Sequence, residues 1–163
     1  MDVSSEVADL FHAFYPRLVV VLYATCGNQG DAEDAAQEAF TKALRNQRRF
    51  VNLDNPESWL RTVALNHLRN GWRHHDVVRR LRGKVPGPQG ALELGPDHVA
   101  IMAALAELDP SQREVVVLHY LVDLPVAEIA ATLGISEGTV KSRLSRSRSR
   151  LASLLTDEER EDA

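Results

Sequence analysis

The stretch that decides the fold runs from Val126 to Arg150 and reads VAEIAATLGISEGTVKSRLSRSRSR. Apolar residues recur in its first half at the spacing of one buried helix face: Val126, Ile129, Ala130 and Leu133. Gly134 follows the last of them, at the position where many helices end in the left-handed conformation. The pattern predicts a short helix that stops at a glycine corner.

A second helix should begin two residues later, because Ser136 is a preferred N-cap residue. It would bury Val140 and Leu144, with Leu151 further along. Its outward residues are polar: Glu137, Thr139, Lys141, Ser142, Arg143 and Arg146. A short apolar helix, a glycine turn and a longer basic helix form a helix-turn-helix, whose second helix enters the major groove of DNA. The alternative is an ordinary helical hairpin with a solvated basic face.

The composition is that of a soluble globular protein, with 44% hydrophobic and 26% charged residues in 163. The longest uninterrupted apolar runs are too short to cross a bilayer, and no secretory signal is visible. Cys26, the only cysteine, excludes an internal disulfide and fits a reducing compartment. We expect a cytoplasmic protein without membrane insertion.

Charge is distributed unevenly along a chain whose net charge is −4. The segment from Arg61 to Lys84 is rich in arginine and contains a single acid, Asp76. Residues 141–150 add further bases and no acid, whereas acids gather at 31–38 and in the tail. Two basic stripes on an acidic chain suggest DNA contact at two places and a different partner for the acidic segment.

Helical periodicity covers the first half of the chain. Apolar residues recur at steps of three and four from Val7 to Thr25, where Pro16 should kink or divide the helix. After a turn at 27–30, Asp31 is the expected N-cap of a helix from 32 to about 47. The apolar stripe of that helix is narrow and built mainly from small residues: Ala32, Ala35, Ala36, Ala39, Phe40, Ala43 and Leu44.

A polar loop, 49–55, should precede a third helix that Asn55 caps and Pro56 begins. We expect this helix to bury a mainly apolar set: Trp59, Leu60, Val63, Ala64, His67 and Leu68. We expect it to expose a polar set: Arg61, Thr62, Asn66, Arg69, Asn70 and Arg73. Amides beside guanidinium groups suit a face that reads base edges and phosphates.

Residues 83–96, GKVPGPQGALELGP, are rich in glycine and proline and should form a flexible linker. Asp97 and Asp109 are expected caps of the next two helices. The first should bury an apolar set: Val99, Met102, Ala103, Leu105 and Ala106. The second carries Val115, Val116, Leu118 and His119. We predict an all-α chain, with helical domains at 1–82 and 97–156 joined by the linker 83–96, and an acidic tail at 157–163.

No pattern in the sequence indicates catalysis. The histidines and Cys26 match no zinc spacing, and no glycine-rich phosphate loop follows a strand. Carboxylates on an exposed helix face lack the burial that tunes a general acid. We therefore expect no enzyme activity, no cofactor and no metal site.

The order of these parts closely resembles bacterial sigma factors of the extracytoplasmic-function (ECF) type. The resemblance rests on DAEDAAQEAFTKALR at 31–45, PESWLRTVALNHLRNGWR at 56–73 and the segment from Leu108 to Leu151. It covers about Val7 to Leu155. The helix-turn-helix alone is also similar to regulators of the LuxR type. Asn70 departs from the acid that is commoner in the family, and Ala35 and Ala36 replace larger aliphatics.

The resemblance implies that the first domain binds the β′ clamp helices of RNA polymerase and opens the −10 promoter element. Implied core-binding residues are Asp31, Asp34, Gln37, Glu38, Thr41 and Lys42. The loop 49–55 would capture a flipped base, and the following helix would flank that pocket. Implied −10 residues are Arg49, Phe50, Asn52, Asn55, Thr62, Asn66, Arg69 and Arg73.

The second domain is similar to the one that reads the −35 element, and Arg113 is a candidate phosphate contact beside it. Implied −35 residues are Arg113, Ser136, Glu137, Thr139, Lys141, Ser142, Arg143 and Arg146. Implied partners are core RNA polymerase, through β′ and β, promoter DNA, and an anti-sigma factor. Two alternatives stay open. One is a stand-alone helix-turn-helix regulator that binds duplex DNA without polymerase, and the other is an interaction protein that sequesters a partner through its acidic helix.

Overall fold

The computed structural model describes residues 2–82 and 96–161, with side chains except those at 73–82, 97, 155, 158, 159 and 161. Every regular element within these ranges is helical. The chain forms two compact units, Met1–Leu92 and Glu93–Ala163. The boundary between them falls inside the predicted linker, of which residues 83–95 lie outside the described part.

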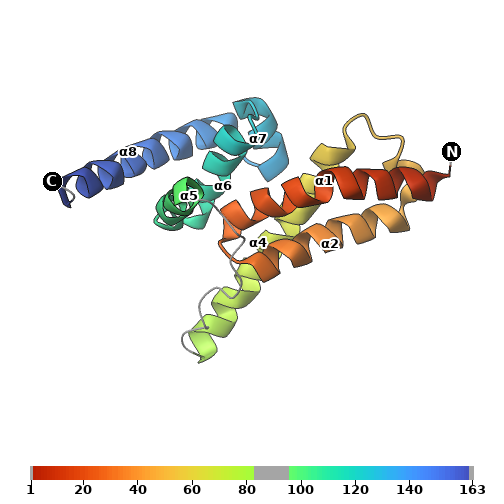
Figure 1. Ribbon diagram of the computed structural model, residues 1–163, viewed down its shortest axis with the longest axis horizontal. Coiled ribbons are helices and arrows are strands. Elements are labelled where there is room, and N and C mark those ends of the chain that lie inside the picture. Colours follow the sequence, from red (N-terminus) through yellow and green to blue (C-terminus); the bar gives the residue numbers. More distant parts are fainter. Residues whose placement is uncertain (1, 83–95, 162–163) are drawn as a thin grey trace. The chain divides into compact units, whose positions relative to one another are not determined.

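The first unit consists of α1 (Val3–Cys26), α2 (Gln29–Arg45), the short α3 (Gln47–Phe50) and α4 (Pro56–Arg82). Helices α1 and α2 run side by side in opposite directions, and α4 packs against both (Figure 1). Large aliphatic side chains of α1 and α4 meet the alanine stripe of α2 in the core. Alanine lets helix axes approach closely, and the buried residues of α2 all belong to this stripe, so its outer face lies outside the core.

Both ends of α1 are closed by local chemistry. Asp2 accepts a hydrogen bond from the Ser4 amide, and Gly27 adopts φ 72° while its amide donates to the Tyr23 carbonyl. Pro16 lies within one continuous helix, so the expected division does not occur.

Helix α1 is also long and apolar enough to cross a membrane by length and composition, with a mean hydropathy of 1.3. The uninterrupted apolar runs within this helix are shorter and do not indicate such a span. Core helices of globular proteins pass the same test. Phe14, Leu18 and Leu22 are buried in the unit, so α1 serves here as a core helix.

The start of α2 differs from the prediction. Asn28, not Asp31, is the N-cap: its backbone is extended, and its Oδ1 accepts from the Asp31 amide at 3.0 Å. Both residue types are good caps, and the helix takes the earlier one, so Gln29 and Gly30 belong to the helix rather than to a turn. At the other end, Leu44 is exposed rather than part of the buried stripe.

Helix α4 begins as predicted, because the Ser58 amide donates to Asn55 Oδ1 at 3.0 Å. Two of its side chains lie opposite to expectation: His67 is exposed and Arg61 is buried. Leu65, which the pattern omitted, is fully buried. The helix therefore turns a different edge to the core than the periodicity suggested.

The second unit consists of α5 (Pro96–Ala106), α6 (Pro110–Val116), the π-helical η1 (Val117–Leu121), α7 (Val126–Leu133) and α8 (Glu137–Glu161). Helix α8 is long and packs against α6 and α7 (Figure 1). The core contains a run of four residues from Val115 to Leu118, with Ile129, Leu133, Val140 and Leu144. Val126 and Leu151, expected on buried faces, are only partly covered.

The ends of this unit depart from the prediction. In α5 only Leu105 of the expected set is buried, and Val99 is 57% exposed. Asp109 occupies the N-cap position of α6 without a side-chain cap bond, and the Asp97 side chain lies outside the described residues. Helix α8 continues to Glu161, so most of the predicted acidic tail is helical.

Candidate functional site

The corner between α7 and α8 has the predicted geometry. Gly134 adopts φ 66° and its amide donates to the Ala130 carbonyl. Ser136 Oγ then accepts from the Thr139 amide at 3.1 Å, and the hydroxyls of these two residues lie 2.8 Å apart. Ser136 and Thr139 therefore fix where α8 starts, because their polar groups are already engaged in the cap.

Helix α8 separates a buried stripe from a polar face. Val140, Leu144 and Ser147 are buried, and the Ser147 hydroxyl donates to the Arg143 carbonyl at 2.6 Å. Within α8 itself, four predicted DNA-contacting residues are exposed: Glu137, Lys141, Ser142 and Arg146. Ser145 is exposed between the last two and was missed, although its position on the same helical face would have identified it. This polar, basic face has the chemistry of a major-groove surface.

Two predicted DNA contacts lie on the inner side of the second unit instead. Arg113 on α6 is only 8% exposed. Arg143 Nη1 lies 3.9 Å from Glu114 Oε1, and their side chains are 26% and 3% exposed. Helix α6 packs against α8 at this level, so the partly exposed Arg143 side chain lies against a buried carboxylate. The outward projection predicted for Arg143 is therefore corrected by the structure, and Arg113, the candidate phosphate contact, is buried.

The outer face of α2 is polar along its length. Asp34, Gln37, Thr41 and Lys42 are exposed, and Asp31 and Glu38 are partly exposed. Lys42 Nζ lies 3.8 Å from Glu38 Oε1, and the Thr41 hydroxyl donates to the Gln37 carbonyl. An exposed i,i+4 ion pair contributes only about 0.3–0.5 kcal/mol, so the face has little role in folding. Its side chains are available to a partner.

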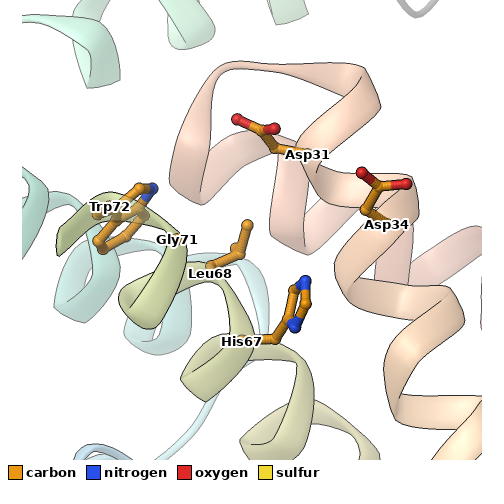
Figure 2. Close-up of a pocket in the computed structure, with 6 residues that line it drawn as sticks. All are labelled: Asp31, Asp34, His67, Leu68, Gly71 and Trp72. Carbon is orange, nitrogen blue, oxygen red and sulfur yellow. The ribbon is translucent and has the colours of Figure 1, made fainter. Parts of the chain in front are cut away.

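A cleft of about 140 Å³ opens where the start of α2 faces α4. Figure 2 shows the carboxylates of Asp31 and Asp34 on the α2 side, while His67 extends from α4 toward that helix. Gly71 and Trp72 line the same opening. Among the described residues no group of three or more histidine, cysteine, aspartate or glutamate side chains could hold a metal ion.

The predicted loop at 49–55 is partly helical. Arg49 and Phe50 belong to α3, and Phe50 is 3% exposed with its ring centroid 5.4 Å from that of Trp59. Phe50 is therefore a core residue of the unit, and its side chain is not exposed as a DNA contact would require. Asn52 is exposed and donates to the Arg48 carbonyl at 2.6 Å, and the side chain of Asn55 caps α4.

The polar face of α4 is otherwise close to the prediction. Asn66 and Asn70 are exposed, and Arg69 is partly exposed. Thr62 is partly exposed and its hydroxyl donates to the Ser58 carbonyl at 3.0 Å. Arg73 lies on the same helix, but its side chain is outside those described. The two amides and Arg69 form a connected polar surface one turn apart.

Comparison with known families identifies both units. The model of Sigma-70 region 2 matches residues 10–77, within the first unit, and that of Sigma-70, region 4 matches residues 98–151, within the second. The ECF RNA polymerase sigma factor EcfG of Rhodopseudomonas palustris is 30% identical, over 99% of this chain and 92% of its own length. The chain belongs to the ECF family of RNA polymerase sigma factors.

Other ECF sigma factors agree with this identification. SigW of Bacillus subtilis is 30% identical over 92% of this chain and 89% of its own length. SigE of Mycolicibacterium smegmatis is 33% identical over 90% of this chain, which spans 60% of that longer relative. Among solved structures, the sigma factor RpoE of Bartonella quintana, in complex with the anti-sigma factor NepR, superposes with a TM-score of 0.79 at 26% identity, covering 93% and 97% of the two chains.

Proposed function

We propose that this chain is the subunit that gives a bacterial core RNA polymerase its promoter specificity, without catalysis of its own. The observation that carries the proposal is the occurrence of region 2 and region 4 in order on one chain, each with an exposed polar face suited to its partner. The protein would act in the cytoplasm, on the nucleoid once bound to polymerase.

Core binding is assigned to the outer face of α2. The residues proposed for contact with the β′ clamp helices are Asp31, Asp34, Gln37, Glu38, Thr41 and Lys42. An acidic face of this kind favours a basic partner surface and accelerates association with it. Because RpoE of Bartonella quintana binds an anti-sigma factor, we include such a protein, with the polymerase β subunit, among the expected partners.

Opening of the −10 element is assigned to the region from α3 to α4. The proposed residues are Arg49, Asn52, Asn55, Thr62, Asn66, Arg69 and Arg73. Exposed amides can pair with the Watson–Crick edge of an extruded base, while arginines hold the backbone of the opened strand. Phe50 is omitted because it is buried.

Recognition of the −35 element is assigned to the exposed face of α8. Lys141, Ser142 and Arg146 would contact base edges or phosphates in the major groove, with Glu137 at the helix start. Ser136 and Thr139 would contribute mainly by fixing that start.

Transcription by sigma-free core polymerase on fragmented genomic DNA tests the proposal. With the chain present, new RNA 5′ ends should appear that share motifs near −10 and −35. Duplex binding by the chain alone, without new start sites, would favour the stand-alone regulator instead.

Charge reversal on α2 tests core binding directly. Asp34→Arg combined with Glu38→Arg should abolish binding to core polymerase while the chain stays folded, because both side chains face away from the core of the unit. The matched control is Asp9→Arg with Asp157→Arg, which changes the net charge equally at two exposed carboxylates elsewhere. Equal core affinity in the two double variants, measured by fluorescence anisotropy, would contradict the assignment.

A further inference from the structure

An ion pair between α6 and α8 distinguishes Arg143 from the other residues of α8 that the family resemblance implies in −35 recognition. Glu114 is almost fully buried, and Arg143 Nη1 approaches its carboxylate to 3.9 Å. By contrast, Lys141, Ser142 and Arg146 on the same helix are exposed. Arginine side chains three residues apart on one helix therefore have different surroundings.

Helical geometry explains the difference. Val140, Leu144 and Ser147 mark the buried stripe of α8, and Arg143 lies at the edge of that stripe, one residue before Leu144. Arg146 comes almost one turn after Arg143, on the same side of α8 but farther round from the buried stripe, and it is exposed. The guanidinium of Arg143 is thus directed toward α6, whereas that of Arg146 is directed toward solvent.

A carboxylate buried to this degree is costly to keep charged without a cationic partner. Removing one member of such a pair leaves an uncompensated charge and is strongly destabilising, whereas removing both is tolerated much better. Arg143 therefore has a task inside the unit that Arg146 does not have. That task is to hold the DNA-facing helix in one orientation against α6.

We infer that Arg143 is a positioning residue, which fixes α8 on α6 through Glu114, and that reading of −35 bases is left to Lys141, Ser142 and Arg146. The inference rests on the proposed function for its DNA part. Its two consequences differ from those of a base-reading arginine. Loss of Arg143 should destabilise the free protein, and it should weaken binding to all −35 sequences by a similar factor.

The first measurement is a thermal double-mutant cycle on the full chain, with no DNA present. Arg143→Met keeps the apolar stem, and Glu114→Gln keeps the shape. Each should lower Tm, and the double variant should lose less than the sum of the two losses because each single variant already loses the interaction between the two side chains. If Arg143→Met does not fold, Arg143→Lys retains a cation and should recover part of the Tm. Additive Tm losses in the cycle would overturn the inference.

The second measurement uses duplexes carrying the −35 element from the start-site mapping, together with versions that change one base pair at a time. With Arg143→Met, the ratio of Kd values between matched and changed duplexes should stay within about twofold of the parent ratio. The matched control Arg146→Met should leave Tm unchanged. If Arg146 makes a bidentate base contact, the Arg146→Met variant should discriminate at that base pair about 5- to 150-fold less than the parent.

The opposite pattern would overturn the inference. That pattern is an Arg143→Met variant with parental Tm that loses discrimination at one base pair, together with a Glu114→Gln variant that binds like the parent. The thermal cycle needs neither polymerase nor promoter. A failure of the proposed sigma function would therefore leave its result intact, and the two failures are distinguishable.

Discussion

At the scale of single residues, alanine substitution at two glycines distinguishes the effect of helix propensity on stability from the effect of a left-handed backbone. A Cβ placed on Gly71, inside α4, would meet nothing within 4 Å, and φ there is not positive. Gly71→Ala should therefore raise the free energy of unfolding by about 0.5–1 kcal/mol, because alanine loses less conformational freedom in a helix. Urea unfolding followed by far-UV circular dichroism measures the change.

Gly134 is the matched control for this substitution. A Cβ there also meets nothing within 4 Å, but φ is +66°. Gly134→Ala should lower the free energy of unfolding by about 1–2 kcal/mol, since an L side chain in the left-handed region carries that cost. Opposite signs at the two glycines are expected. A lower free energy of unfolding for Gly71→Ala would show that something other than helix propensity requires glycine at this position of α4.

At the scale of elements, the start of α8 depends on one hydroxyl. Ser136→Ala should lower the free energy of unfolding by about 1 kcal/mol and speed exchange of the Thr139 amide, which loses its acceptor. Ser136→Asp should keep both close to the parent, because aspartate also caps and suits the positive end of the helix dipole. Equal losses in the two variants would instead assign the effect to the contact between the Ser136 and Thr139 hydroxyls.

Elements whose ends depend on neighbouring residues were the predictable part of this fold. Gly134 ends one helix, and Ser136 and Asn55 each begin another, through hydrogen bonds within a few residues. The sequence pattern located all three. The α2 cap was misplaced because Asn28 and Asp31 are both good caps, and local rules do not choose between them. The π-helical segment at 117–121 has no local signature of this kind.

The candidate sites were less predictable than the helices, because exposure depends on contacts between elements. Periodicity placed Arg143 outside the apolar stripe of α8 but could not show that α6 packs against α8 there, nor that Arg113 on α6 is buried. Phe50 was assigned to a loop, although its ring packs on Trp59 from the next helix. Alanine-rich α2 was the favourable case, since only one of its faces can approach other helices closely.

At the scale of the whole molecule, the two proposed DNA surfaces belong to separate compact units of one chain. Covalent linkage makes the second binding event effectively intramolecular, which can raise overall affinity by about 10²–10⁴ over separate modules. A protease site inserted between Gly90 and Ala91 allows the chain to be cut near the boundary of the units. At nanomolar concentration, cutting should lower promoter-directed RNA synthesis by at least about 100-fold.

The same protein with the inserted site left uncut controls for the insertion itself. Raising both fragments together toward micromolar concentration should recover part of the RNA, since the loss is one of effective concentration and both surfaces remain intact. Transcription by the cut chain equal to that of the uncut chain would mean that a single unit carries promoter recognition. The two polar faces, on α2 with α4 and on α8, would then not act together at one promoter.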